Sequence, residues 1–294
     1  MKAQTGCKPE HTLPLFTIHY SLFTIPMCRL LAYLGSPISL DSILRQPPHS
    51  LVVQSYQPQE MTAGLLNADG YGLGWYDRRR QSQAFTYKSI LPIWSDINLP
   101  SLSGYIHSDC ILAYVRSATP GQALDLSNCQ PFTYHNWSFI HNGAIPEFRD
   151  RLYRPLRDRL RSPYYELING STDSEHLFAY LMQLHHGQPQ PSLQQTLKIA
   201  LQDFQELAIT HNSKLSANLI LSDGQHLIAC RFAVNTEAPS LYYLAQNDQH
   251  FIASEPIFPG NWQAFPSGSI LNLAMTANVT ADTPQSPDWI LVNP

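Results

Sequence analysis

Four stretches rich in apolar residues predict the strands of a β-rich core. They are Cys28–Leu34, Asn67–Tyr76, Cys110–Val115 and Trp137–Ile140. The second stretch also contains repeated glycines, which predict tight turns that lead into its strand. Arg116 directly follows the third stretch and Asn142 closely follows the fourth, so both are expected where core strands pass into loops.

Two later segments have the spacing of helices. Thr172 and Glu175 are spaced as in a capping box, in which each side chain accepts a hydrogen bond from the other residue's backbone N–H. Apolar residues then recur at helical spacing, so a helix is predicted to begin beside Asp173. A second helix is predicted over residues 192–210, and a β-hairpin with an Asp-Gly turn over residues 219–229. Strands at both ends of the chain with helices between them indicate a mixed α and β fold.

The composition indicates a globular protein and argues against several kinds of partner. Of the 294 residues, 44% are hydrophobic and 14% are charged, against about 25% charged residues in typical domains. The formal net charge is −4 and there is no basic run, which argues against nucleic acid. We expect no membrane partner either. The five cysteines are odd in number and far apart, which favours a reduced, cytoplasmic protein. No paired metal-binding motif accompanies them, so no metal and no cofactor are expected.

Residues 1–27 are predicted to be absent from the mature protein. Proline and polar residues interrupt their apolar stretch, and no small-residue cleavage motif precedes Cys28, so a secretory signal is not indicated. We favour an upstream extension from a misplaced start codon; the alternative is a pro-segment that is removed autocatalytically. In the first case translation begins at Met27, and removal of this methionine exposes Cys28. Residues 28–294 are predicted to form a single domain, because no repeat or obvious linker divides them.

A cysteine at the amino terminus can act as a nucleophile without a separate histidine. The free α-amine has an ordinary pKa of about 8, so near neutral pH it can accept the thiol proton directly or through a water molecule. For a cysteine taken alone, burial as a small apolar residue is the commoner role. Three motifs favour catalysis for Cys28, and these are Val115–Gly121, Phe139–Ile145 and Ser171–Leu177.

In this order, the cysteine and the three motifs resemble the class II glutamine amidotransferases of the N-terminal-nucleophile hydrolase superfamily. The resemblance extends from Met27 to about Ser254. It implies an α+β fold, a four-layer αββα sandwich in which two packed sheets lie between helical layers. Three further stretches are similar to the amidohydrolases of ergothioneine biosynthesis within this family, and these are Pro47–Tyr56, Asn67–Trp75 and Pro92–Asp96.

The resemblance implies a catalytic role for three residues. Cys28 is expected to attack the carbonyl of a γ-glutamyl amide and to form a thioester, while its α-amine carries the proton to the leaving nitrogen. The Asn142 side chain and the Gly143 N–H are expected to bind the oxyanion. Taken alone, an Asn-Gly pair between apolar runs is typical of a type I′ hairpin turn, which is the alternative interpretation.

Three further residues are expected to bind the glutamyl end of the substrate. By resemblance, Arg116 binds the α-carboxylate, for which the guanidinium geometry is well suited. Asp173 accepts the α-ammonium, and Thr119 supplies hydroxyl or backbone contacts. Taken singly, Arg116 would be a surface arginine at a strand end and Asp173 a helix N-cap. The ordered set of residues favours the functional interpretation.

The resemblance therefore implies a small-molecule γ-glutamyl substrate. We expect hydrolysis of γ-glutamyl-hercynylcysteine sulfoxide to glutamate and hercynylcysteine sulfoxide. Its trimethylammonium group suits an aromatic pocket, for which the candidates are Tyr56, Tyr71, Trp75 and Trp94. Two alternatives stay open: a stand-alone glutaminase subunit that passes ammonia to a partner synthase, and a non-catalytic binding protein that keeps the fold. A homo-oligomer is compatible with the sequence.

Overall fold

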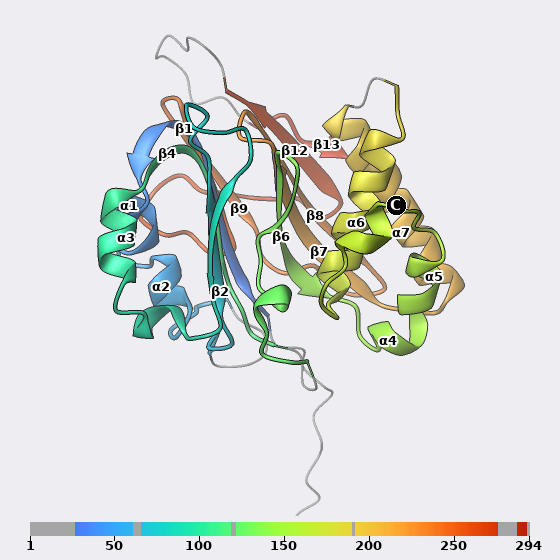
Figure 1. Ribbon diagram of the computed structural model, residues 1–294. Helices are drawn as coiled ribbons and strands as arrows, with labels where there is room; N and C mark the ends of the chain where they lie inside the picture. Colours follow the sequence, from blue (N-terminus) through green and yellow to red (C-terminus); the bar gives the residue numbers. More distant parts are fainter. Residues whose placement is uncertain (1–26, 61–65, 119–121, 190–191, 276–286, 293–294) are drawn as a thin grey trace, which may run out of the picture.

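Two antiparallel sheets form the centre of the protein (Figure 1). The computed structural model describes residues 27–60, 66–118, 122–189, 192–275 and 287–292. In spatial order, the first sheet consists of β11 (Gln263–Ala264), β9 (Tyr242–Gln246), β10 (Gln249–Ala253), β1 (Arg29–Ser39), β4 (His107–Val115), β2 (Tyr71–Trp75) and β3 (Phe85–Ser89). The second consists of β13 (Ile290–Leu291), β12 (Ser269–Ala274), β8 (His226–Val234), β7 (Leu215–Ser222), β6 (Trp137–Ala144) and β5 (Phe132–Tyr134).

Helices cover the outer face of each sheet (Figure 1). The helices beside the first sheet are α1 (Asp41–Leu44), α2 (Leu51–Gln54) and α3 (Leu99–Tyr105). Those beside the second sheet are α4 (Phe148–Arg151), α5 (Tyr153–Arg157), α6 (Asp173–His186) and α7 (Leu193–Thr210). Short 3₁₀ turns lie at η1 (Ile93–Ser95), η2 (Leu126–Asn128) and η3 (Tyr164–Leu167). The predicted α+β sandwich with two sheets between helical layers is confirmed.

The strand β1 is buried on both faces, which explains its continuous apolar sequence. Successive side chains of a strand point to opposite faces of its sheet. Leu30 and Leu34 accordingly join the core between the two sheets, whereas Leu31 and Tyr33 join the core beneath α1, α2 and α3. A third apolar core lies between the second sheet and α4 to α7. Cys28 belongs to the core between the sheets, at the start of this central strand.

The local sequence signals for helices and the hairpin are confirmed. Thr172 is the N-cap of α6, and its side chain and that of Glu175 form the reciprocal capping box. The second predicted helix corresponds to α7, which is capped by the Ser192 hydroxyl. The predicted hairpin consists of β7 and β8, with Gly224 at the turn in the positive-φ region at 87°. These elements depend on interactions between residues close in sequence.

The Asn142-Gly143 pair does not form a hairpin turn. Both residues lie inside β6, where Asn142 pairs with Asn218 and Gly143 with Ala217 of β7. The expected position of Asn142 in a loop is therefore wrong, while Arg116 does follow the end of β4 as predicted. A Cβ atom on Gly143 would come within 2.0 Å of the Ser216 carbonyl oxygen. Glycine is thus required at position 143 because the neighbouring strand approaches closely. It is not required by a turn conformation.

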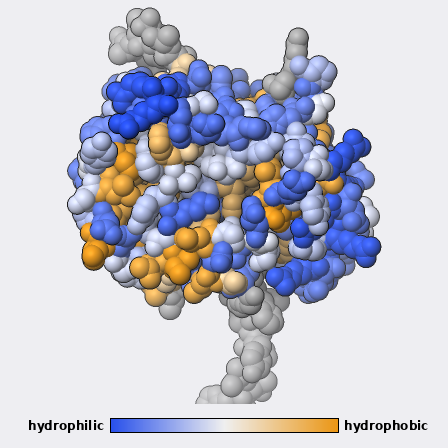
Figure 2. Space-filling model, viewed as in Figure 1, coloured by the Kyte–Doolittle hydropathy of each residue, from blue (hydrophilic) through white to orange (hydrophobic). Residues whose placement is uncertain are grey.

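The surface is mixed in character. On the face shown in Figure 2, apolar residues form separate groups among hydrophilic ones. Large apolar side chains with substantial exposure include Leu91, Ile97 and Tyr105. Within the described ranges, no helix has the length and apolarity needed to cross a bilayer.

Candidate active site

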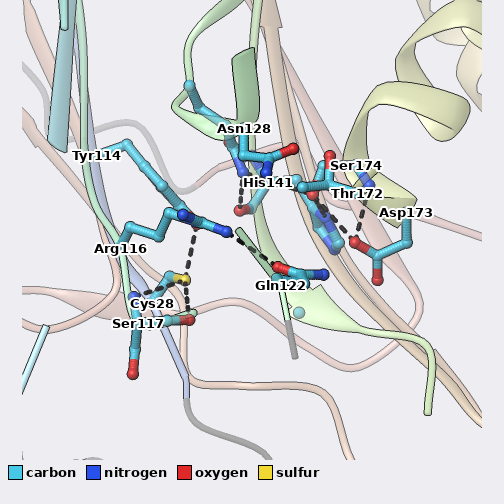
Figure 3. A pocket seen from close by; sticks show the side chains of 12 residues that line it. Cys28, Tyr114, Arg116, Ser117, Gln122, Asn128, His141, Thr172, Asp173 and Ser174 are labelled. Atoms are coloured by element: carbon cyan, nitrogen blue, oxygen red, sulfur yellow. Dashed lines mark hydrogen bonds between the residues drawn. The ribbon is translucent and has the colours of Figure 1, made fainter. Parts of the chain in front are cut away.

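A small polar pocket lies where the start of β1, the end of β4, β6 and the start of α6 meet (Figure 3). Its lining residues are Cys28, Tyr114, Arg116, Ser117, Gln122, Asn128, Gln130, His141, Gly143, Thr172, Asp173 and Ser174. Four of the six predicted site residues are thus brought together: Cys28, Arg116, Gly143 and Asp173. Asn142 is not among the lining residues, and Thr119 lies outside the described residues.

The Cys28 sulfur is surrounded by hydrogen-bonding groups from β4 and the residues that follow it. The Tyr114 hydroxyl donates to Cys28 Sγ at 2.7 Å, and the Ser117 N–H donates to the same atom at 3.4 Å. The thiol itself can donate to the Ser117 carbonyl oxygen at 3.5 Å. Because Cys28 is only 8% exposed, its sulfur is largely withdrawn from bulk solvent.

Burial raises the pKa of the Cys28 thiol above its ordinary value. The Tyr114 and Ser117 hydrogen bonds oppose this shift, as do the positive charges of Arg116 and Arg29, but burial outweighs them. The sulfur is therefore protonated near neutral pH. A nucleophilic Cys28 needs a base that removes its proton, and the α-amine of an N-terminal cysteine is such a base.

The Arg116 guanidinium is buried and is held by uncharged oxygens. It donates to the Ala123 carbonyl at 3.3 Å. It also donates to the Gln122 side-chain oxygen at 3.1 Å, as Figure 3 shows. Within the described ranges Arg116 forms no ion pair, although it is only 2% exposed. Charge-assisted hydrogen bonds are stronger than those to neutral oxygens. A carboxylate that enters the pocket would therefore be a better partner for Arg116 than its present ones.

Asp173 joins the start of α6 to the end of β6. One carboxylate oxygen accepts a hydrogen bond from the Ile145 N–H at 3.0 Å, and the other accepts from the Ser174 N–H at 2.8 Å. Thr172 is the N-cap of the helix, so the alternative interpretation of Asp173 as an N-cap is wrong. The carboxylate lines the pocket and is available to a cation there.

His141 lines the pocket, although no sequence motif predicts a role for it. Its Nδ1 lies 2.8 Å from Ser174 Oγ, and its Nε2 lies 3.4 Å from the Ser216 carbonyl oxygen. Since a carbonyl only accepts, Nε2 carries the proton in the neutral ring, and Nδ1 faces the Ser174 hydroxyl, which also lies 3.3 Å from Asp173 Oδ1. Burial lowers the pKa of His141, which favours this neutral form. The Gln130 side chain bonds to both backbone groups of His141, which fixes this part of β6.

Asn142 faces the space between the sheets, on the opposite side of β6 from His141. Its side-chain nitrogen donates to Ser254 Oγ at 3.4 Å. Ser254 Oγ also accepts from the Leu30 N–H, two residues after Cys28. The Asn142 Oδ1 atom is buried without a hydrogen-bond partner in the described ranges. Asn142 is thus connected to the start of β1, and its role as an oxyanion ligand stays a prediction.

A buried ion pair holds the backbone at Cys28. Arg29 Nη1 donates to the Cys28 carbonyl at 2.9 Å, and Arg29 Nε pairs with Glu255 at 2.8 Å. Glu255 also bonds to His49 Nε2 at 2.6 Å and accepts from the backbone N–H groups of Gln59 and Glu60. Because Arg29 and Glu255 are at most 1% exposed, this network fixes the backbone at Cys28.

The aromatic residues proposed for a trimethylammonium pocket do not line this pocket, so their contact with the substrate stays a prediction. Tyr71 is fully buried and its hydroxyl donates to Asp96 at 2.6 Å. Trp94 meets Tyr56 edge to face with ring centroids 5.8 Å apart, and both rings are partly exposed. Trp75 stacks on Phe85 of the neighbouring strand. Each ring already has a packing or hydrogen-bond partner outside the pocket.

Solved structures share this layered fold. A glutamine aminotransferase class-II domain protein from Silicibacter pomeroyi superposes with a TM-score of 0.61 at 25% sequence identity, covering 84% of this chain and 95% of that one. The glutamine phosphoribosylpyrophosphate amidotransferase of B. subtilis gives a TM-score of 0.57 at 14% identity, and the match covers 86% of this chain and 50% of that one. The fold is that of the N-terminal-nucleophile type of glutamine amidotransferase.

Sequence comparisons define the family. The profile described as "Glutamine amidotransferases class-II" matches residues 27–250. The protein therefore belongs to the class II glutamine amidotransferases and is an amidohydrolase enzyme. It is 30% identical to the "Probable glutamine amidotransferase DUG3" of Saccharomyces cerevisiae, over 84% of this chain and 82% of that protein. It is 33% identical to the "Gamma-glutamyl-hercynylcysteine sulfoxide hydrolase" of Mycobacterium tuberculosis, over 78% of this chain and 85% of that protein.

Proposed function

We propose that the protein hydrolyses a γ-glutamyl amide through a thioester on Cys28. The observation that carries this proposal is the shared pocket of a cysteine thiol, an arginine that has no ionic partner among the described residues, and a helix-terminal aspartate. Arg116 would bind the substrate α-carboxylate and Asp173 the α-ammonium, so the γ-carbonyl would be directed toward Cys28 Sγ. The Gly143 N–H and the Asn142 side chain are the proposed oxyanion ligands.

The proposed reaction has two chemical steps. In the first, the α-amine of Cys28 takes the thiol proton, the sulfur bonds to the γ-carbonyl carbon, and the amine protonates the departing nitrogen. In the second, water attacks the thioester and releases glutamate. Because burial raises the pKa of the thiol, proton removal by the amine is an essential part of the first step.

We also propose that the mature enzyme begins at Cys28. The family match starts at residue 27, which supports a natural start at Met27 followed by removal of the methionine. The intact mass of the natively expressed protein tests this proposal. A mass that corresponds to a chain beginning at Cys28 is expected, and a mature chain beginning at Met1 would exclude both the misplaced start and the removable pro-segment.

The proposed substrate is γ-glutamyl-hercynylcysteine sulfoxide, and the name of the Mycobacterium tuberculosis relative supports it. The second candidate is glutamine, with ammonia passed to a partner synthase, which the name of the yeast relative supports. Glutamate release from the two compounds in parallel distinguishes them. A tenfold higher kcat/KM for the sulfoxide, equivalent to about 1.4 kcal/mol in transition-state binding, is expected. Preference for glutamine would favour the second candidate.

Arg116→Ala is expected to raise KM for the γ-glutamyl substrate by about 10- to 100-fold, because a bidentate charge-assisted contact to the α-carboxylate is lost. Arg116→Lys should recover only part of the affinity, since an ammonium lacks the planar fork. Steady-state kinetics with Arg80→Ala, which removes an exposed arginine, provide the control. Unchanged KM in Arg116→Ala would remove Arg116 from the substrate site.

A further inference from the structure

The Tyr114 hydroxyl donates a hydrogen bond to the Cys28 sulfur. Tyr114 pairs with Leu30 across β4 and β1, and Leu30 shares a sheet face with Cys28 two residues earlier. The tyrosine side chain therefore reaches Cys28 along the diagonal of the strand pair, and its hydroxyl ends 2.7 Å from Sγ. This is the one hydrogen bond of that hydroxyl in the described part of the chain, and Tyr114 is only 4% exposed.

We propose that Tyr114 is a further catalytic residue, whose hydroxyl donates a hydrogen bond to the Cys28 thiolate both when the sulfur attacks and when it leaves. This inference rests on the proposed function, in which Cys28 is the nucleophile. Together with the Ser117 N–H, which points to the same atom, the hydroxyl forms a two-donor site for a sulfur anion. The sequence motifs do not predict that Tyr114 or Ser117 contacts the sulfur.

The contact stabilises one state of the sulfur more than the others. A thiol is a weak hydrogen-bond acceptor, and a thiolate is a strong one because it is charged. Removal of a thiolate from water into this buried position is costly, so each fixed donor has a large effect. The neutral sulfur of the thioester gains little from the same donor. Tyr114 therefore favours the charged sulfur before acylation and again after the thioester breaks, which is differential stabilisation.

The proton balance does not require Tyr114 to ionise. In acylation the thiol proton moves to the α-amine, the S–C bond forms, the C–N bond breaks, and the amine gives the proton to the leaving nitrogen. In deacylation water supplies the hydroxyl group of the acid, its other proton goes to the amine, and the S–C bond breaks to leave the thiolate. Burial and the neighbouring sulfur raise the pKa of Tyr114 well above its ordinary value, so its hydroxyl stays protonated as a donor.

The test is Tyr114→Phe in protein whose first residue is shown by mass spectrometry to be Cys28. We expect kcat for γ-glutamyl hydrolysis to fall by about 10- to 100-fold with KM changed less than threefold. The rate of Cys28 alkylation by iodoacetamide, located by peptide mass spectrometry, should have its pH midpoint raised by about one unit. Tyr243→Phe is the matched control, because it removes a buried hydroxyl of the same core that bonds to His250. It should leave the midpoint unchanged.

A second variant of nearly the same shape distinguishes loss of the hydrogen bond from misfolding of Tyr114→Phe. With 3-fluorotyrosine at position 114, the hydroxyl is retained and becomes a stronger donor, so the alkylation midpoint should move down instead of up. If neither Tyr114→Phe nor 3-fluorotyrosine at position 114 shifts the alkylation midpoint, while the wild-type protein hydrolyses its substrate normally, the role of Tyr114 is overturned. The proposed function is unaffected by that result. Shifted midpoints in a protein that hydrolyses no γ-glutamyl amide would reject the proposed function and retain the hydrogen bond to the thiolate.

Discussion

Cys28→Ala is expected to abolish glutamate release, with kcat reduced at least about 10⁴-fold. The substitution removes the only proposed nucleophile, and neither the buried Arg116 nor the neutral His141 can replace a thiolate that forms a covalent intermediate. The fold should persist, because the change deletes one sulfur atom at the start of a strand that is paired on both sides. Loss of stability should be about 1 kcal/mol, measured by denaturant unfolding.

Cys110→Ala is the matched control for this experiment. Cys110 is fully buried in the same core between the sheets, where its sulfur lies 3.1 Å from Ser222 Oγ. Its replacement should leave kcat within a factor of a few. A Cys28→Ala protein with the turnover of the wild type would contradict the thioester mechanism.

Glu255→Ala is expected to lower the free energy of unfolding by about 3–5 kcal/mol. The substitution leaves the Arg29 guanidinium buried without its carboxylate, and an unpaired buried charge is costly. Asp158→Ala removes a carboxylate that pairs with Arg154 on the exposed surface, and its effect should stay within about 1 kcal/mol. Denaturant unfolding of both variants measures the difference, and equal losses would contradict the structural role of the Glu255 network.

The same carboxylate makes stability depend on pH. Burial alone would raise the pKa of Glu255. The pKa is nevertheless lowered, because the carboxylate accepts hydrogen bonds from His49 and from the backbone N–H groups of Gln59 and Glu60 and lies beside the charge of Arg29. The folded pKa therefore lies below the unfolded value of about 4.3. The stabilisation is fully present above the unfolded pKa and is lost as the pH falls through the folded one. Wild-type protein should lose stability below about pH 4.3, and Glu255→Gln should lose less over the same range.

The elements that the sequence predicts correctly are those determined by neighbours along the chain. The capping box of Thr172 and Glu175 and the Asp-Gly turn between β7 and β8 depend on a few consecutive residues, and both are present. The Asn-Gly pair shows the limit of such signals. Its alternative interpretation as a turn considered only local backbone freedom, whereas Gly143 is required by the Ser216 carbonyl of another strand.

The candidate site was predicted only in part for the same reason. Cys28 could be selected because it follows a possible start methionine, and Arg116, Gly143 and Asp173 because each stands in a motif. The pocket brings the four residues together. Tyr114 carries no such signal, because its contact with Cys28 joins residues 86 positions apart and depends on the register of β1 and β4. The four aromatic candidates lie outside this pocket, and the sequence alone cannot show which sheet face a ring occupies.

The position of Cys28, the proposed nucleophile, at the start of a central strand has a consequence for how the enzyme loses activity. Chain ends usually open readily, and backbone amides there exchange with solvent quickly. Here the backbone from Arg29 onward is paired with β4 and that from Leu31 with β10, while Arg29 also bonds to the Cys28 carbonyl. Local fraying would therefore break two strand ladders at once. Slow hydrogen exchange should begin close to Cys28, the proposed first residue of the mature chain, and thermal inactivation should coincide with cooperative unfolding of the protein.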